Sequence, residues 1–137
     1  MKFTRVDATI STNKLIESKE FYMDHFGFQL VYESDWYIEL VGTEIPAGIS
    51  FTLPQREAGE YFNGKGLILS FEVADVDSEY ARLKAEGVPI LQEMQNKPWG
   101  ERSFVVDDPN GVHLYIYKSI PATPEYQEIY ESFQKKA

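Results

Sequence analysis

Hydrophobic and polar residues alternate strictly near the end of the chain. Every second residue from 112 to 116 is aliphatic, and the residues between and after them are aromatic: His113, Tyr115 and Tyr117. Because successive side chains of a strand point to opposite faces, this pattern predicts a strand with one buried face and one hydrogen-bonding aromatic face. The preceding Asp108-Pro109-Asn110-Gly111 predicts a tight turn, with an Asp acceptor, a Pro that presets φ, and Asn and Gly that tolerate positive φ. Together they predict a hairpin with a candidate binding surface on one face.

The same kind of pattern predicts the element order β-α-β-β-β in the first half of the chain. Alternation predicts a strand over residues 6–10, and helical spacing predicts a helix over residues 14–26 that ends at Gly27. Three further strands are expected at residues 28–33, 36–41 and 48–53.

The second half repeats this order. A strand is predicted over residues 67–73, a helix over 75–86, a strand over 89–93, and two more strands in the hairpin around residue 110. Tyr22 and Gly27 have counterparts in Leu83 and Gly87 at a nearly constant separation of about 60 residues. Such a repeat indicates the duplication of one supersecondary unit.

The predicted fold class is α+β, with two βαβββ modules forming a curved mixed sheet around a central cup, helices outside, and a C-terminal helix. We expect a single domain over residues 1–119, made of module one (3–53), a linker (54–65) and module two (66–119), followed by a helical extension at 120–137. Thr123 and Pro124 are expected to start the last helix. Its apolar residues recur at i, i+3, i+4 and i+7: Tyr126, Ile129, Tyr130 and Phe133. This stripe predicts docking on the domain itself or on a second copy of the chain.

Composition narrows the function classes. The 137 residues are 43% hydrophobic and 26% charged, which is typical of a globular domain. A net charge of -9 argues against nucleic acid and anionic membrane surfaces as partners, and mildly favours cationic ligands. The absence of Cys excludes disulfides, thiolate metal sites and Cys nucleophiles. With no leader pattern and no membrane-length apolar run, we expect a cytoplasmic protein.

The sequence resembles the vicinal oxygen chelate superfamily, which includes glyoxalase I, extradiol dioxygenases, fosfomycin-resistance enzymes and bleomycin-resistance proteins. The resemblance reaches to about residue 119 and is carried by residues 14–22, 26–28, 71–77 and 98–111. The run Pro98-Trp99-Gly100-Glu101-Arg102 most resembles the bleomycin-resistance branch. The resemblance implies paired βαβββ modules and, commonly, a homodimer.

Metal-dependent members of this superfamily hold their ion on the first and last strands of each module. The resemblance places these positions at Asp7, Ile68, Thr52 and Tyr115. Only Asp7 is an ordinary ligand, because Ile68 cannot coordinate, Thr52 is weak, and a Tyr phenol must first lose its proton. His113 could join Asp7, but two ligands hold a metal poorly. We therefore expect no cofactor, with a divalent metal as the alternative, which disfavours glyoxalase, dioxygenase and thiol-transferase activities.

Two functions are carried forward. The first is a metal-free, drug-binding or resistance-type protein that holds a small aromatic or cationic molecule in its cup, without catalysis. Trp36 and Tyr37 point to opposite faces of one strand, so only one should line the cup. The expected ligand-binding residues are Asp7, Trp36, Tyr37, Glu39, Thr52, Trp99, Arg102, His113, Tyr115 and Tyr117.

The second is an enzyme of lyase, isomerase or dioxygenase type. It would use Asp7, His113 and one further group to hold Zn²⁺, Mn²⁺ or Fe²⁺, or it would use Glu39 or Glu72 as a base without metal. A vestigial cup in a domain that serves only in association is a third possibility. Two structural alternatives also stay open: Trp99 as a lid or a dimer contact, and the Tyr115–Tyr117 stripe as a binding wall or a filled core.

Overall fold

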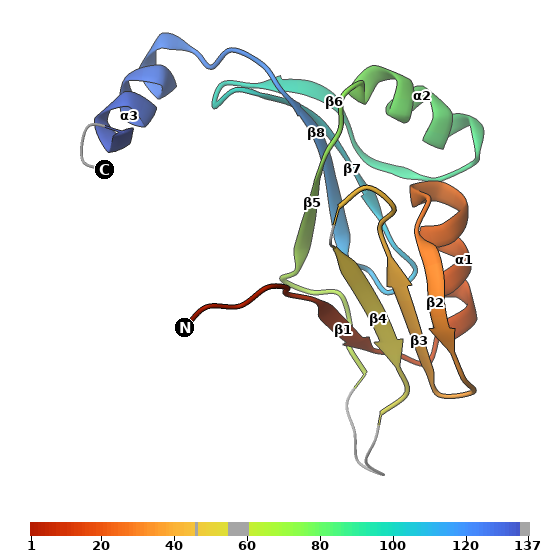
Figure 1. The fold of residues 1–137 in the computed structure, drawn as a ribbon. Coiled ribbons are helices and arrows are strands. Elements are labelled where there is room, and N and C mark those ends of the chain that lie inside the picture. Colours follow the sequence, from red (N-terminus) through yellow and green to blue (C-terminus); the bar gives the residue numbers. More distant parts are fainter. Residues whose placement is uncertain (46, 55–60, 135–137) are drawn as a thin grey trace. The chain divides into compact units, whose positions relative to one another are not determined.

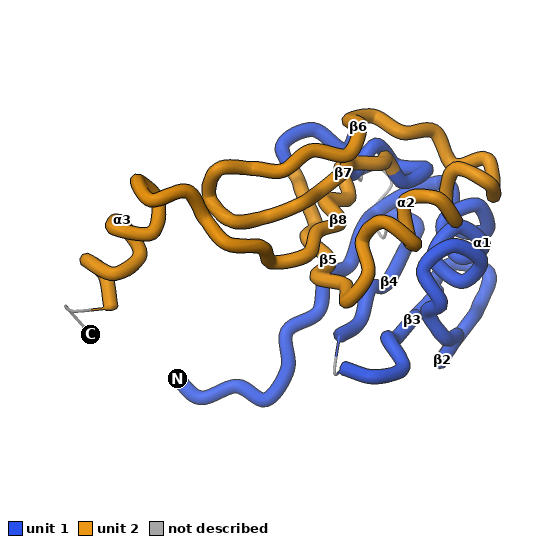
Figure 2. Tube along the Cα trace, turned by 90° about the horizontal axis from the view of Figure 1, so that it is seen from above, with its two compact units in different colours: residues 1–66, 108–112 blue, residues 67–107, 113–137 orange. Residues whose placement is uncertain are grey.

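The predicted βαβββ order occurs twice in the computed structural model, which describes residues 1–45, 47–54 and 61–134 (Figure 1). The chain divides into two compact units (Figure 2). Unit 1 comprises residues 1–66 and 108–112, and unit 2 comprises residues 67–107 and 113–137. The α+β class, the two mixed sheets and the C-terminal helix confirm the predicted fold class. Position 46 and residues 55–60 of the expected linker lie outside the described residues.

Unit 1 holds a four-stranded sheet in the order β1-β4-β3-β2, in which only the β1–β4 pair is parallel. Its elements are β1 (Ala8–Ser11), α1 (Leu15–Phe26), β2 (Gln29–Glu33), β3 (Tyr37–Val41) and β4 (Gly48–Thr52). The first strand begins at Ala8 rather than at the expected Val6, which is 71% exposed. Gly27 ends α1 as predicted, because its φ of 69° is readily adopted only by glycine.

One face of this sheet forms the core of unit 1 with α1. Ile38 lies opposite Phe51 in the register, and both are fully buried. The Tyr22 ring of α1 stacks 5.6 Å from the Phe51 ring, centroid to centroid. The opposite face of the sheet points away from α1, and we call it the helix-free face of unit 1. It carries the alternate residues of the strands, which include Thr9, Tyr37, Glu39, Ser50 and Thr52.

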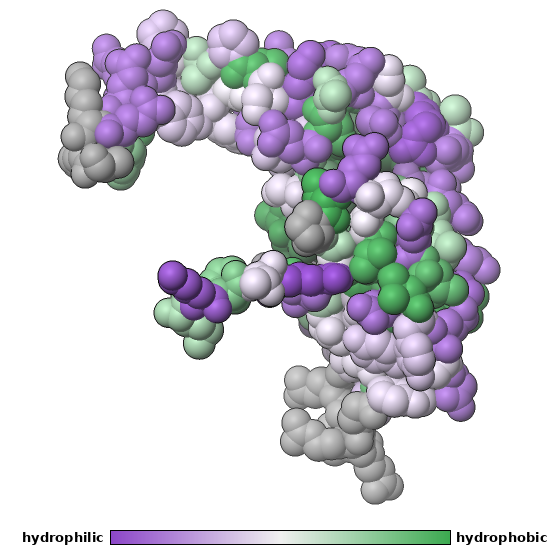
Figure 3. All heavy atoms as spheres, in the orientation of Figure 1, coloured by the Kyte–Doolittle hydropathy of each residue, from purple (hydrophilic) through white to green (hydrophobic). Residues whose placement is uncertain are grey.

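The edge strand β2 is unlike the rest of this sheet. All five of its residues are exposed, among them Leu30 and Val31, and hydrophobic atoms (green) are visible over the strands of unit 1 in Figure 3. An edge strand that exposes aliphatic side chains and unpaired backbone groups is a surface suited to association.

The turn at residues 108–112 belongs to unit 1, although the sequence assigns it to the second module. Asp108 Oδ1 accepts hydrogen bonds from the backbone N–H groups of Asn110 (2.8 Å) and Val112 (2.9 Å), which is the predicted turn chemistry. Asp108 Oδ2 accepts a hydrogen bond from Tyr22 Oη at 2.7 Å. Within this turn Gly111 has positive φ (84°), and Asn110 does not.

Burial of this turn makes it part of the unit 1 interior. Asp108 is 5% exposed and Asn110 is 8% exposed. The Asn110 amide donates to Ser18 Oγ at 2.9 Å and accepts from Thr12 Oγ1 at 2.5 Å. Burial, with the charge and hydrogen bond of Asp108, raises the pKa of Tyr22 far above its ordinary range, so this hydroxyl stays a donor.

Unit 2 repeats the arrangement with the strand order β5-β8-β7-β6, in which only β5 and β8 are parallel. Its elements are β5 (Ile68–Glu72), α2 (Val76–Ala85), β6 (Ile90–Lys97), β7 (Glu101–Asp107), β8 (His113–Ser119) and α3 (Pro124–Gln134). Asp75 caps α2 by accepting from the Ser78 N–H at 3.1 Å, and Pro124 starts α3 as predicted.

The core of unit 2 lies between its sheet and α2. Phe104 and Ile116 face each other across β7 and β8, and the Tyr80 ring of α2 packs 5.0 Å from Phe104 in a T-shaped arrangement. No helix within the described ranges is long and apolar enough to cross a membrane.

Candidate ligand-binding site

Unit 2 also has a helix-free face, and the predicted aromatic stripe of β8 lies on it. The register pairs His113 with Asp107 and Tyr115 with Val105, while the alternate residues Leu114 and Ile116 are buried in the core. The face is therefore built from three adjacent strands. Its residues on these strands are Ile68, Ser70, Glu72, Glu101, Ser103, Val105, Asp107, His113, Tyr115 and Tyr117.

A hydrogen-bonded cluster of Trp99, Glu101 and Tyr115 organises this face. Glu101 Oε1 accepts from Trp99 Nε1 at 2.6 Å and from Tyr115 Oη at 2.9 Å. Burial is the main cause that raises the pKa of Tyr115, and the hydrogen bond and charge of Glu101 raise it further. The phenol therefore stays protonated and donates, and one carboxylate fixes both aromatic side chains.

A cavity of about 260 Å³ opens beside this cluster, and we call it the sheet-face cavity. Its walls combine aromatic and aliphatic side chains with the polar side chains of Gln92, Lys97 and His113. It is lined by Ile68, Leu91, Gln92, Lys97, Trp99, Val105, His113 and Tyr115. A concave site with apolar walls and few polar groups is the usual form of a small-molecule pocket.

His113 brings a titratable group to the same cavity. Its Nδ1 contacts Asp107 Oδ1, and Nε2 has no hydrogen bond among the described residues. A carboxylate at Nδ1 holds the proton there, which leaves the Nε2 lone pair free to accept a proton. The arrangement can therefore act as a general base.

Tyr117 extends the aromatic stripe away from the cavity. Its ring lies 5.6 Å from the Tyr115 ring, tilted by 37°, and its hydroxyl donates to Glu72 at 3.4 Å. Ser119 Oγ also donates to Glu72, at 3.3 Å. Glu72, an expected candidate base, is exposed and already accepts two hydroxyl groups.

Arg102 lies on the other face of the sheet. Its guanidinium donates to both carboxylate oxygens of Asp77, at 2.7 and 3.1 Å, and to Asn96 at 2.9 Å. Asp77 belongs to the first turn of α2, so this ion pair fastens the helix to the sheet. Sequence reasoning expects Arg102 near the ligand, but the structure does not bring it to the helix-free face.

The five expected site residues of unit 1 are only partly brought together. Tyr37, Glu39 and Thr52 share the helix-free face of unit 1. Trp36 precedes β3, is 46% exposed, and lies 5.7 Å from the Tyr37 ring. Of the adjacent pair, Tyr37 is therefore the residue that lines this face.

Asp7 lies just before β1 rather than within it. Its carboxylate pairs with Arg5 Nε at 2.7 Å. A Cβ on Gly48 would lie 2.6 Å from Asp7 Oδ1, so the ion pair covers the backbone of this glycine. Asp7 is thus already neutralised by a neighbour within its own unit.

The sequence matches one protein family over residues 5–116: the Glyoxalase/Bleomycin resistance protein/Dioxygenase superfamily. The chain belongs to this superfamily. This confirms the resemblance that the sequence motifs indicate. No curated protein matches the chain.

Solved structures share the fold of this superfamily member. TnmS3, an antibiotic binding protein from Streptomyces sp. CB03234, is 22% identical, with a TM-score of 0.70 over 87% of this chain and 98% of that chain. A superfamily member from Sphaerobacter thermophilus DSM 20745 is also 22% identical, with a TM-score of 0.70 over 85% and 98%. A lactoylglutathione lyase from Agrobacterium tumefaciens is 18% identical, with a TM-score of 0.67 over 86% and 96%. At these identities the likeness shows the fold alone.

The donor set at the superfamily's metal positions does not fit a divalent ion. Ile68 has no donor atom, Asp7 is paired with Arg5, and the pKa of Tyr115 is raised rather than lowered. Thr52 Oγ1 donates to the Leu53 carbonyl at 2.9 Å. Within the described residues, no three His, Asp or Glu side chains gather as possible metal ligands.

Glu101 is the main site residue that sequence reasoning missed. The alternation that predicts this face covers only residues 112–117. Extended back along β7, the same period places Glu101 with Ser103 and Val105 on the helix-free face. Lys97 lies beyond the predicted strand over residues 89–93, because the rest of β6 is mostly polar and carries no alternation. Leu91 and Gln92 lie within that strand, but its pattern does not show which face each side chain takes, and its register shifts twice.

Proposed function

We propose that this superfamily member binds a planar aromatic small molecule in the sheet-face cavity, without a metal. The proposal rests on the Trp99–Glu101–Tyr115 cluster, which holds an indole and a phenol in fixed positions on an apolar wall. Preorganised aromatic walls favour a flat ligand because stacking adds to area burial without further ordering of the protein. A cavity of about 260 Å³ suits one ring system of such a ligand.

Of the two ligand types that the sequence predicts, an aromatic one fits this cavity better than a cationic one. Lys97 lines the cavity, and its Nζ lies 5.7 Å from the Trp99 ring centroid. A cation bound in the sheet-face cavity would meet the charge of this ammonium group. We therefore propose a neutral or anionic planar ring as the occupant.

Replacing Tyr115 with Phe tests the cluster, and Tyr117→Phe is its matched control on the same strand face. In a Trp36→Phe background Trp99 is the only tryptophan, so its indole N–H gives one NMR resonance that can be followed during titration with 2-naphthoate. We expect Y115F to weaken binding roughly fivefold. Glu101 then loses the hydrogen bond from Tyr115, and Trp99 is held by a carboxylate that is itself less fixed. Y117F should change binding less than about twofold, because its hydroxyl contacts Glu72 instead.

Three results would contradict this proposal. They are no saturable shift of the Trp99 resonance, equal losses in Y115F and Y117F, and equally tight binding of cyclohexanecarboxylate, which has the same charge without the aromatic ring.

A second candidate function is metal-free acid–base catalysis, which the His113–Asp107 contact favours. The sequence predicts Glu39 or Glu72 as the metal-free base, but it is His113 that combines a carboxylate partner with a place at the wall of a cavity. Glu72 lacks such a place, and Glu39 belongs to the sheet of unit 1.

Hydrolysis of 4-nitrophenyl acetate to acetate and 4-nitrophenolate tests this second function. We expect H113Q to lower the initial rate about tenfold or more, because a positioned imidazole activates the attacking water. H25Q, which changes the chain's other histidine, should leave the rate unchanged. A rate in wild-type protein equal to that of H113Q would remove the candidate.

Other parts of the expected function stay predictions. A homodimer is supported by the exposed aliphatic residues of β2 and by the exposed Ile129 and Phe133 of α3. A role in drug resistance and a cytoplasmic location are predictions of the sequence.

A further inference from the structure

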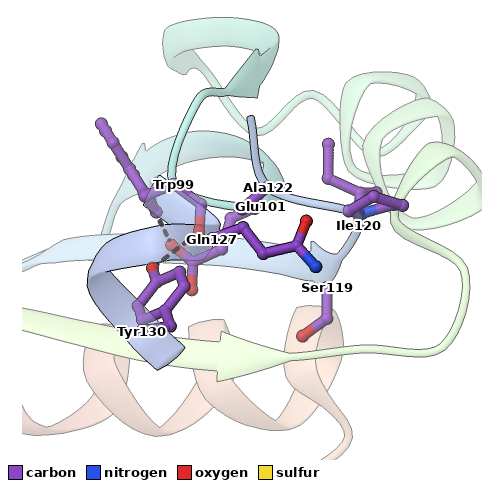
Figure 4. Close-up of a pocket in the computed structure, with 9 residues that line it drawn as sticks. Trp99, Glu101, Ser119, Ile120, Ala122, Gln127 and Tyr130 are labelled. Carbon is purple, nitrogen blue, oxygen red and sulfur yellow. Dashed lines mark hydrogen bonds between the residues drawn. The ribbon is translucent and has the colours of Figure 1, made fainter. Parts of the chain in front are cut away.

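A second cavity, of about 420 Å³, lies where the sheet of unit 2 meets its C-terminal helix (Figure 4). We call it the C-terminal cavity. The Trp99 indole borders both this cavity and the sheet-face cavity. Its lining residues are Trp99, Gly100, Glu101, Ser119, Ile120, Pro121, Ala122, Gln127 and Tyr130. Residues 119–130 fall beyond the segment that matches the superfamily, whereas Trp99, Gly100 and Glu101 lie within it.

Hydrogen bonds tie the walls of this cavity to one another. The Ile120 N–H donates to the Gly100 carbonyl at 2.8 Å, and the Thr123 N–H donates to the Pro98 carbonyl at 2.9 Å. Tyr130 Oη reaches back from α3 and donates to the Trp99 carbonyl at 2.7 Å, as the dashed line in Figure 4 shows. The cavity is therefore built before any ligand arrives.

The backbone at Gly100 also requires glycine at this place. Its φ is 101°, and a Cβ would lie 2.9 Å from the Ile120 carbonyl oxygen. The strap of residues 120–123 passes this close to the loop before β7 because no side chain intervenes.

Charge in the C-terminal cavity is one-sided. Glu101 is the only ionisable acid or base among its lining residues apart from the phenol of Tyr130, and Lys97 lines the sheet-face cavity instead. Both hydrogen bonds that Glu101 accepts in the described structure end at Oε1. Oε2 takes part in none of them, so one carboxylate oxygen remains for a positively charged group.

The remaining walls suit the rest of an organic cation. Trp99 and Tyr130 offer aromatic rings, which attract cations through their quadrupole. Ile120, Pro121 and Ala122 offer an apolar surface for alkyl groups. The Tyr126 ring meets the Trp99 ring edge to face at 6.4 Å and helps to hold the indole in place.

We propose that the C-terminal cavity binds an alkylated ammonium cation, held between the Glu101 carboxylate and the rings of Trp99 and Tyr130. An alkylated ammonium fits better than a primary one because the side chains of Ile120, Pro121 and Ala122 cannot accept a hydrogen bond. The net charge of -9 adds a long-range attraction for such a ligand. This site lies in a different cavity from the proposed aromatic site, although Trp99 borders both cavities and Glu101 hydrogen-bonds to Trp99 and Tyr115.

Titration with choline and with its neutral carbon isostere, 3,3-dimethylbutan-1-ol, tests the proposal. The readout is again the Trp99 indole N–H resonance in the Trp36→Phe protein. We expect choline to bind at least about tenfold more tightly than the alcohol. E101Q should remove this preference. E125Q should keep it, because Glu125 is an exposed carboxylate of α3 that does not line the cavity.

A cavity-filling variant guards against a folding defect in E101Q. Ala122→Phe should abolish choline binding and leave 2-naphthoate binding intact, because Ala122 lines only the C-terminal cavity. Equal binding of choline and the alcohol, equal losses in E101Q and E125Q, or choline binding that survives A122F would each overturn the proposal. Loss of 2-naphthoate binding alone would overturn only the proposed function.

Discussion

Replacing Asp108 with Ala is expected to lower the free energy of unfolding by roughly 3 kcal/mol, because several buried donors then lose their acceptor. Asp108 is 5% exposed and accepts from the Tyr22 hydroxyl and from the N–H groups of Asn110 and Val112. Truncation at Cβ leaves all three donors without this partner inside unit 1. The loss also releases Asn110, whose side chain joins Thr12 and Ser18.

Chemical denaturation of D108A and D107A measures this effect with a matched control. Asp107 is the adjacent acid, its side chain is 40% exposed, and it contacts His113. D107A should therefore cost less than about 1 kcal/mol. D108N should fall between the two, because the amide oxygen still accepts the backbone groups. A D108A protein as stable as D107A would show that the buried turn does not support unit 1.

Much of the fold follows from short-range patterns. The αL position of Gly27, the start of α2 next to Asp75 and the Pro124 start each depend on chemistry within a few residues, and each lies where the sequence predicts. The turn after β7 indicates this strand, in which four consecutive residues are buried. Alternation finds β8, because its core-facing residues alternate with less buried ones. It shortens β6, whose exposed polar residues carry no such signal.

The candidate site is harder to predict because it depends on contacts between separate segments. The aromatic face of β8 follows from the period of the strand, but its hydrogen-bond partner Glu101 comes from the neighbouring strand. Arg102 is the opposite case. The Pro98–Arg102 motif predicts that it contacts the ligand, but its place on β7 points the guanidinium to the other face of the sheet, toward Asp77 and α2. Register between strands decides both cases, and composition does not encode it.

The destination of the Asp108–Gly111 turn could not be predicted either. Sequence identifies the turn by its residue types, but its burial beside Tyr22 and Ser18 joins positions about 90 residues apart. Gly64 makes the same point. It looks like an ordinary loop glycine, yet it is buried, and a Cβ there would lie 2.4 Å from the Gly111 carbonyl carbon and oxygen.

Gly64→Ala is accordingly expected to destabilise the protein by about 3 kcal/mol or more, through two additive causes. The φ of Gly64 is +80°, which a Cβ disfavours by about 1–2 kcal/mol. The clash falls on backbone atoms of Gly111 and Asn110, and backbone cannot rotate aside as a side chain can. The turn would have to move, and with it the hydrogen bonds of Asp108.

Gly66→Ala separates the two causes, since Gly66 has the same φ of +80° but nothing within 4 Å of the added Cβ. We expect G66A to lose only the backbone contribution, about 1 kcal/mol, in the same denaturation experiment. The difference between the two variants then measures the close packing of Gly64 against the turn. Equal losses would mean that the turn can shift freely. In that case the large effect expected for Asp108 would also shrink, because both depend on a turn held rigidly inside unit 1.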